Sequence, residues 1–236
     1  MLQNTQSLEK KMEKMENIEQ MLSLDWDMPK KPYPAKVITL PTGSKMVVRE
    51  IQREEVPHLL DAIRPLLTVA ADYYDIVSAR MYAELLGWYR YRVRNEYCLV
   101  GIVDGELAGI VNNRLYDNKT CISYHTMALK RGGRVGAHLF AAKQEHAIEN
   151  YGVDQILVTA ESPIGFNRWM VEWNLEPRPG LQHELGGAAA YALTKEGYGI
   201  RKSKLVFGER PVPKDLYEQT LNFKVVPPDM VKEAKA

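Results

Sequence analysis

The sequence predicts a mixed α/β fold, built on a twisted sheet of about six to seven strands with helices on both faces. Strand-like apolar runs and helical segments follow one another between residues 45 and 200 in the order β-α-α-β-β-β-α-β-α-β. The dipeptide Asp104-Gly105 separates two apolar runs and is a strong hairpin signal. A later helical segment, which ends near Tyr151, joins two strand runs and predicts a parallel pair. Antiparallel and parallel pairs in one sheet, connected by helices, define the mixed class.

Each element is predicted from its own residues. The first helix of the domain has two glutamates and a proline in its first turn, where both residue types are tolerated or favoured. The second helix is rich in aromatic residues, which at helical spacing are more typical of a core than of a ligand site. The predicted strands are 45–51, two within 97–117, 120–129, 153–162 and 188–198, and the predicted helices are 54–67, 73–92, the segment ending near 151, and 164–176.

The two ends of the chain differ in composition from the domain between them. Residues 6–23 have an apolar stripe at helical spacing and predict a helix that docks on the domain or on a partner. Residues 24–44 contain four prolines and predict an extended linker. We therefore expect an N-terminal helix and linker at 1–44, a domain at 45–200 and an extended C-terminal arm at 201–236.

The bulk composition is that of an ordinary globular protein, with 45% apolar and 26% charged residues. The net charge of +1 carries no general signal for nucleic acid or for an acidic membrane, and neither is expected as a partner. No apolar run approaches the ~20 residues of a membrane span, and the first residues lack the apolar core of a signal peptide. The expected location is the cytoplasm. Cys98 and Cys121 lie in apolar runs and are interpreted as buried free thiols, with no metal site expected.

The stretch "RGGRVG", residues 131–136, combines glycines and arginines at the start of a helix. Free backbone N–H groups at a helix N-terminus, together with the helix dipole, bind phosphate. Glycines allow close approach, and Arg131 and Arg134 can add charge-assisted hydrogen bonds. The alternative is a solvated turn with two surface arginines. A dinucleotide site is disfavoured because G-x-G-x-x-G spacing is absent and three strand runs precede the turn, and a P-loop is disfavoured because no Gly-Lys-Ser/Thr follows.

The element order, with a basic glycine turn after the fourth strand, resembles the GNAT superfamily of N-acetyltransferases over roughly residues 45–198. The family signature is Q/R-x-x-G-x-G/A. Arg131 and Gly136 match its first and sixth positions, while Arg134 stands where glycine is usual and Gly133 lies one place earlier. The resemblance implies acetyl-CoA as co-substrate, with no metal. By the same resemblance, the coenzyme-binding residues are Thr126, Met127, Ala128, Arg131, Gly132, Gly133, Arg134, Val135, Gly136, Ala137 and Asn167.

Acetyl transfer needs a base for the acceptor ammonium and an acid for the leaving thiolate. His125 is the first candidate base, because it lies beside the expected thioester and histidine titrates near neutral pH. Glu161, at a strand end, is the second. Their alternatives are a sheet-face histidine and a solvated glutamate. Many family members carry N-x-x-A-x-x-x-Y on the next helix, but here Asn174 occupies the tyrosine position. Tyr191, on the last strand, is the remaining candidate acid.

Two functions stay open on this evidence. The first is an acetyl-CoA-dependent N-acetyltransferase that acts on an amine-bearing small molecule or protein by direct attack in a ternary complex. Asp72 and Asp75, near the aromatic second helix, are candidates for attracting that amine. The second is a catalytically inactive GNAT-fold binding or structural protein that works in a homo- or hetero-oligomer through its terminal arms. A homo-oligomer is expected in either case.

Overall fold

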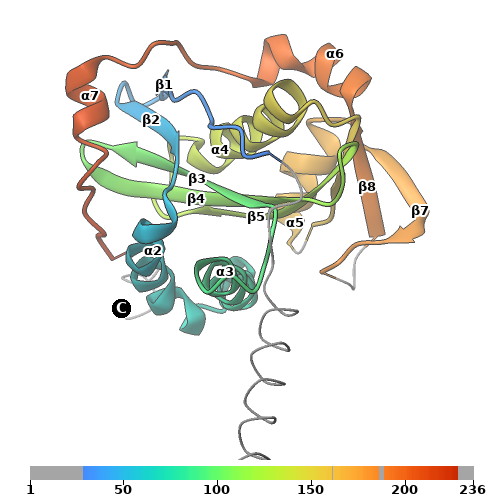
Figure 1. Ribbon diagram of the computed structural model, residues 1–236, viewed down its shortest axis with the longest axis horizontal. Coiled ribbons are helices and arrows are strands. Elements are labelled where there is room, and N and C mark those ends of the chain that lie inside the picture. The colour runs from blue at the N-terminus through green and yellow to red at the C-terminus, as the bar shows by residue number, and fades with distance from the viewer. Residues whose placement is uncertain (1–28, 161, 186–188, 228–236) are drawn as a thin grey trace, which may run out of the picture.

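The computed structural model describes residues 29–160, 162–185 and 189–227, and its centre is a single eight-stranded sheet (Figure 1). The spatial order of the strands is β1-β2-β3-β4-β5-β6-β8-β7. All neighbouring strands are antiparallel except β5 and β6, which are parallel. The strands are β1 (Lys36–Thr39), β2 (Lys45–Glu50), β3 (Glu96–Val103), β4 (Glu106–Leu115), β5 (Thr120–Ala128), β6 (Gln155–Val158), β7 (Glu176–Gln182) and β8 (Ala189–Thr194).

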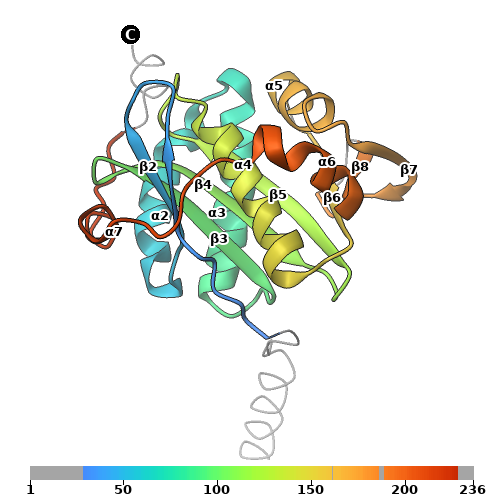
Figure 2. The ribbon, with the colours of Figure 1, turned by 90° about the horizontal axis from the view of Figure 1, so that it is seen from above.

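Helices cover both faces of the sheet. Helices α2 and α3 pack on one face, and α4 and α6 lie on the other, as Figures 1 and 2 show. A short helix, α5, continues into a π-helical segment, and a π-helical turn likewise extends α4. The helices are α2 (Val56–Ile63), α3 (Tyr74–Tyr89), α4 (Val135–Glu145) with its extension (His146–Tyr151), α5 (Pro163–Gly165) with its continuation (Phe166–Val171), α6 (Lys195–Leu205) and α7 (Lys214–Glu218).

The mixed α/β class, the hairpin and the parallel pair are confirmed. Asp104 and Gly105 both have positive φ, as a two-residue hairpin turn between β3 and β4 requires. The strand number is eight and exceeds the predicted six to seven. Strand β1 lies in the segment expected to be a linker. Strand β7 contains two prolines, which are tolerated because it is the edge strand of the sheet.

Two apolar cores lie on opposite faces of the sheet, one under α4 and one under α2 and α3. The two cysteines are buried and free, as predicted, and lie in different cores. Burial raises the pKa of the Cys98 thiol well above its usual range. Both thiols are therefore core residues. The helix predicted at residues 6–23 falls outside the described residues.

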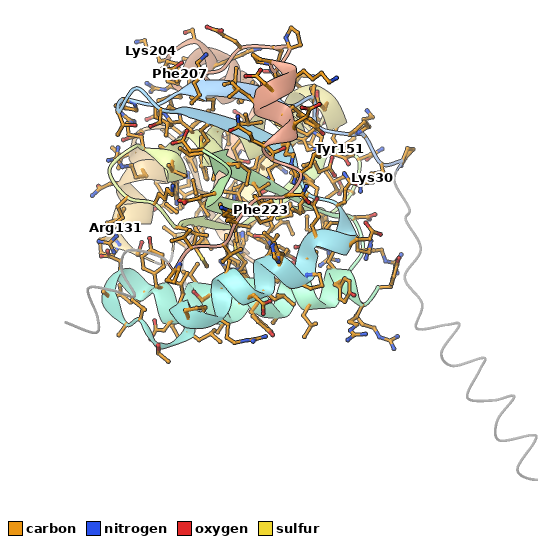
Figure 3. The ribbon with its side chains drawn as sticks, turned by 90° about the vertical axis from the view of Figure 1, so that its left-hand side faces the viewer. Lys30, Arg131, Tyr151, Lys204, Phe207 and Phe223 are labelled. Carbon is orange, nitrogen blue, oxygen red and sulfur yellow. The ribbon has the colours of Figure 1, made fainter. Side chains whose placement is uncertain are left out.

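The chain after α6 crosses the domain and packs on it as far as residue 227 (Figures 1 and 2). Glu209 and Val37 exchange two backbone hydrogen bonds at the edge of β1. Thr220 accepts from the buried Arg49, and Phe223 is buried in the core under α2 and α3 (Figure 3). The segment 206–227, part of the predicted arm, is therefore attached to its own domain.

A buried carboxylate joins three distant segments on the α4 face. Glu145 accepts hydrogen bonds from Lys36 Nζ at 2.6 Å, Tyr33 Oη at 2.8 Å and Arg210 Nη1 at 3.0 Å. Burial alone would raise the pKa of Glu145, but the Arg210 guanidinium and the Lys36 ammonium lower it overall. Lys36 itself is 1% exposed, so its charge depends on this carboxylate.

Within the described part of the chain, no helix is both long enough and apolar enough to cross a membrane.

We predict that Glu145→Gln destabilises the protein by about 3 kcal/mol, because the buried ammonium of Lys36 loses its counter-charge. Equilibrium unfolding in urea measures this free energy. The control is Glu218→Gln, since Glu218 is exposed and its Lys214 partner is 3.7 Å away. A loss for Glu145→Gln as small as that of the control would contradict the predicted role of the cluster.

Candidate active site

A cavity of about 380 Å³ opens where β5 and β6 separate. The two strands are in register over three pairs, the last being Ile122 with Leu157. Beyond that pair β5 continues to Ala128, whereas β6 ends at Val158. The cavity lies between these diverging strands and the start of α4. Many of the described residues that line the cavity therefore belong to the strand and the glycine-rich turn that the sequence predicted as a ligand site.

The N-terminus of α4 faces this cavity. The first intrahelical hydrogen bond runs from His138 N to Arg134 O at 3.1 Å. The N–H groups of Val135, Gly136 and Ala137 precede that bond, and all three residues line the cavity. A Cβ on Gly136 would lie 3.6 Å from the Cβ of Ala128, so the helix begins close against β5. Free N–H groups and the positive end of the helix dipole thus meet at the cavity wall.

The fourth position of the basic turn, Arg134, has a backbone conformation that favours glycine. Arg134 is the N-cap of α4 and has φ 57°, in the left-handed region. A non-glycine residue pays about 1–2 kcal/mol for this conformation. The Arg134 guanidinium extends to Glu172 at 3.4 Å, and Arg168 contacts the same carboxylate at 2.6 Å. The side chain is therefore directed toward the segment after α5, while the backbone of the turn stays at the cavity.

The charged residues among the described lining are predominantly basic. They include Lys130, Arg131, Arg134 and Arg168, with Asp72 as the acidic one. Arg131, which Figure 3 shows at the periphery of the molecule, pairs with Asp72 at 3.1 Å. These ion pairs are half-exposed and weak, so an anionic ligand can replace the carboxylate partners. The mouth of the cavity has the charge that a phosphate ligand requires.

A β-bulge in β5 determines the positions of the Tyr124 and His125 side chains at the cavity. Val111 pairs with Thr126 and Asn113 pairs with Ser123, so two residues of β5, Tyr124 and His125, face Asn112 alone. The bulge brings the rings of Tyr124 and His125 side by side, with centroids 6.3 Å apart and planes at 26°. Both residues line the cavity.

A buried lysine from α4 supports the bulge. Lys143 Nζ donates to the carbonyl oxygens of His125 at 3.1 Å and Asn112 at 3.3 Å. Burial lowers the pKa of Lys143 to about 7. The lysine thereby supplies hydrogen bonds to two carbonyl groups at the bulge, where the regular pairing between β4 and β5 is interrupted.

The imidazole of His125 is held by a carboxylate. His125 Nε2 lies 3.0 Å from Glu84 Oε1 on α3, and its backbone N–H donates to Asn112 Oδ1 at 3.0 Å. Asn112 Nδ2 in turn donates to Glu84 Oε2 at 2.8 Å. A carboxylate that fixes the orientation of an imidazole is the arrangement expected of a histidine base.

A second carboxyl group, Glu96, lies behind this pair and accepts from Asn112 Nδ2 at 2.9 Å. Burial, with the nearby charge of Glu84, raises the pKa of Glu96 to about 8. Glu96 therefore carries a proton at neutral pH, and Glu84 is the carboxyl group in direct contact with His125.

The predicted site residues fall into two groups. Those that the structure brings together around the cavity are His125, Thr126, Ala128, Arg131, Gly132, Arg134, Val135, Gly136 and Ala137. Four others do not contribute to the described lining: Gly133, Met127, Asn167 and Tyr191. Met127 is buried in the core under α2 and α3, and the ring of Tyr191 packs against Phe166. Glu161 lies outside the described residues. The roles assigned to all of these residues stay predictions.

Sequence reasoning did not identify Tyr124, which lines the cavity, or Glu84, which contacts the cavity residue His125. Tyr124 donates to Glu184 Oε2 at 2.6 Å, and Glu84 is 41 positions from the histidine that it contacts. No local pattern indicates either contact, because both depend on the bulge and on α3 packing against β5. Ser162, at the end of the predicted strand 153–162, does line the cavity, and it caps α5 by accepting from Gly165 N at 3.0 Å. Among the described residues, no three His, Cys, Asp or Glu side chains group as metal ligands.

No protein-family model and no curated protein matches the sequence. Solved structures do match. An uncharacterized protein (bh2621) from Bacillus halodurans is 9% identical and covers 74% of this chain and 97% of its own, with a TM-score of 0.53. The apo structure of FdhC, a nucleotide-linked sugar GNAT, is 8% identical over 76% of this chain and 100% of its own, at a TM-score of 0.49. The GNAT domain of S. lividans PAT is 12% identical and covers 70% of this chain and 99% of its own, with a TM-score of 0.49.

At these identities the likeness concerns the fold alone. The described sheet has one parallel pair, which separates, and a helix that begins at a basic turn, within a mixed sheet covered by helices on both faces. The fold predicted from the sequence is therefore confirmed.

We predict that Glu96→Gln changes the pH dependence of stability. The Glu96 carboxyl has a folded pKa of about 8, against 4.5 as its ordinary value. The folded state therefore binds more protons than the unfolded state between these values, so this group lowers stability as pH rises across that window. The glutamine keeps the contact with Asn112 and removes the titration. Relative to wild type, the variant should gain stability from about pH 5 to about pH 8, by a few kcal/mol at most.

Urea unfolding at both pH values measures this gain. Lys143 is present in both proteins, so its titration cancels in the comparison. Glu54→Gln, at an exposed position, is the control. Parallel pH profiles of wild type and Glu96→Gln would show that Glu96 is not held in its protonated form.

Proposed function

We propose that this protein binds acetyl-CoA and transfers its acetyl group to an amine. The observation that carries the proposal is the position of the α4 N-terminus, which lies with four basic side chains at the mouth of the cavity between the separating strands β5 and β6. The coenzyme is a pyrophosphate joined to a long arm that ends in a thioester. A basic helix N-terminus that leads into a narrow strand-lined cavity suits both parts.

The pyrophosphate is assigned to the turn at residues 131–136. Gly132, with φ 89° and no atom within 4 Å of an added Cβ, leaves room for a ligand beside the backbone. The free N–H groups of α4 supply hydrogen bonds, and Arg131 exchanges Asp72 for phosphate oxygens. The remaining basic lining residues add positive potential.

The arm of the coenzyme is assigned to β5. Backbone groups of β5 beyond Ile122 have no partner strand on the side of β6, because the registered pairs end there. Thr126 and Ala128 line the cavity along this stretch. An extended ligand that carries amide groups can hydrogen-bond to such an edge as an added strand does.

We assign the role of general base in this reaction to His125. The imidazole removes a proton from the acceptor ammonium, and the neutral amine attacks the thioester carbonyl. The new N–C bond forms, the C–S bond breaks, and the thiolate takes up a proton. Glu84 stabilises the imidazolium that results from the first step. Glu161 and Tyr191 remain candidates for the other proton transfers.

A GNAT-fold binding protein without catalysis is the alternative. It is favoured by the position of Asn174, which stands where the family tyrosine is expected and adopts φ 51° in a turn. The contribution of terminal arms to an assembly has less support, because the described part of the C-terminal arm packs on its own domain.

We predict that Gly136→Glu weakens the binding of CoA by at least about tenfold, because a carboxylate at the first turn of α4 repels phosphate and fills the close contact with β5. Arg131→Glu should have a smaller effect. Isothermal titration calorimetry with CoA measures both. The control is Gly199→Glu on α6, where no atom lies within 4 Å of an added Cβ. Unchanged affinity in Gly136→Glu would remove this turn as the phosphate site.

We predict that wild-type protein releases free thiol from acetyl-CoA in the presence of an amine, and that His125→Gln lowers the rate roughly 100-fold or more. A thiol-release assay with spermidine, a lysine-containing peptide and free amino acids measures the reaction. His58→Gln, at an exposed position on α2, is the control. Tight binding of acetyl-CoA by the folded protein, with no turnover of any amine, would favour the alternative.

A further inference from the structure

The side chain of Arg134 has no part in the proposed binding of the pyrophosphate. Arg134 has φ 57°, a backbone conformation that favours glycine. A glycine at this position would adopt the same conformation without the cost that a side chain adds. The backbone N–H groups of the turn would serve the pyrophosphate equally well with glycine. An arginine at this position therefore indicates a role for the guanidinium itself.

The guanidinium of Arg134 meets a second arginine at the cavity. Arg168, in the π-helical continuation of α5, lines the cavity as Arg134 does. Both side chains contact the carboxylate of Glu172. Arg134 Nη2 lies 3.4 Å from Oε2, and Arg168 Nη1 lies 2.6 Å from Oε1. Two cations share one anion, so the cluster of these three residues carries one positive charge in excess.

Both arginines keep the capacity to bind a ligand. Among the described residues, each guanidinium is hydrogen-bonded through one nitrogen atom, and its other N–H donors stay available. The three side chains are 31–48% exposed, and ion pairs at such positions are weak. A ligand with more negative charge and more oxygen atoms than one carboxylate can therefore displace Glu172.

The cluster adjoins the site assigned to the pyrophosphate. Arg134 is the N-cap of α4, so its backbone belongs to the turn at 131–136 while its guanidinium is at the cluster. Besides the pyrophosphate, CoA carries a phosphomonoester on the 3′-oxygen of its ribose, and that one sugar separates the two groups. A phosphomonoester has a charge of about −1.5 to −2 at pH 7 and three terminal oxygen atoms. Two arginines suit it better than they suit a carboxylate.

We propose that Arg134 and Arg168 bind the 3′-phosphate of the coenzyme and thereby select CoA over its 3′-dephospho form. This inference rests on the proposed function and names the residues that bind a second anionic group of its ligand. Glu172 holds the two guanidinium groups together until the phosphate displaces it. The departure of Arg134 from glycine is then a specificity feature of this chain.

A comparison of CoA with 3′-dephospho-CoA isolates this phosphate, because the two compounds differ in nothing else. Isothermal titration calorimetry on the wild-type protein should show CoA bound at least about tenfold more tightly. Equal affinity for the two compounds overturns this inference alone, since the pyrophosphate is present in both. Wild-type protein that binds neither compound overturns the proposed function together with it. This measurement requires no variant.

The variant Arg168→Gln removes one guanidinium of the cluster. We expect it to weaken the binding of CoA by about tenfold and to leave the binding of 3′-dephospho-CoA within about twofold. Arg178→Gln is the control, because Arg178 lies on β7, pairs with Glu176 at 2.8 Å and is not part of the described lining. Equal weakening of both compounds in Arg168→Gln shows a structural role and overturns the inference.

Two further variants separate ligand binding from structural support by the direction of their effects. Arg134→Gly gives the turn the residue that its backbone favours, so we expect a higher urea midpoint of unfolding together with CoA binding about tenfold weaker. Glu172→Gln removes the competing carboxylate, and we expect it to bind CoA about threefold more tightly. If the cluster only ties the α5 continuation to the turn, Glu172→Gln weakens both compounds instead, and that result overturns the inference.

Discussion

The separation of β5 from β6 is the feature on which the candidate site depends, and the bulge supported by Lys143 lies at the start of that separation. A regular β5 would place Tyr124 and His125 on opposite faces of the sheet. The bulge places both on one face, beside the cavity. Two carbonyl groups at the bulge, those of Asn112 and His125, accept hydrogen bonds from Lys143 Nζ. Strand geometry and side-chain position are thus fixed by one buried contact from α4.

Three ionisable groups lie close together behind the bulge. Lys143, Glu84 and Glu96 are all shielded from solvent to some degree, and each can be ionised only where a partner compensates. Burial lowers the pKa of Lys143 and raises that of Glu96, so both move toward their neutral forms near neutral pH. Glu84, which is less buried, contacts His125 Nε2 through Oε1. Of the two carboxyl groups, only Glu84 is in direct contact with the imidazole of His125.

The sequence predicted the parts of the fold that depend on local patterns. The hairpin at Asp104-Gly105 and the α4 turn follow from residue types at fixed spacing. Strand β1 was missed because its segment is flanked by prolines, and β7 was missed because it contains two prolines. Both strands are at edges of the sheet, and at the edge position of β7 the missing N–H groups of its prolines are tolerated. The contact of His125 with Glu84 was beyond prediction, since it depends on α3 packing against β5 in the complete fold.

Arg134 shows why a departure from a motif need not abolish the site. Glycine is usual at this position because the backbone must adopt positive φ, and Arg134 adopts it too, at 57°. The requirement is therefore met at a conformational cost, which the stable packing of α4 against the sheet can sustain. The arginine side chain is long enough to reach Glu172, so it leaves the free N–H groups of α4 directed at the cavity. A short β-branched residue at the same position would bring its bulk next to those groups and would tolerate positive φ less well.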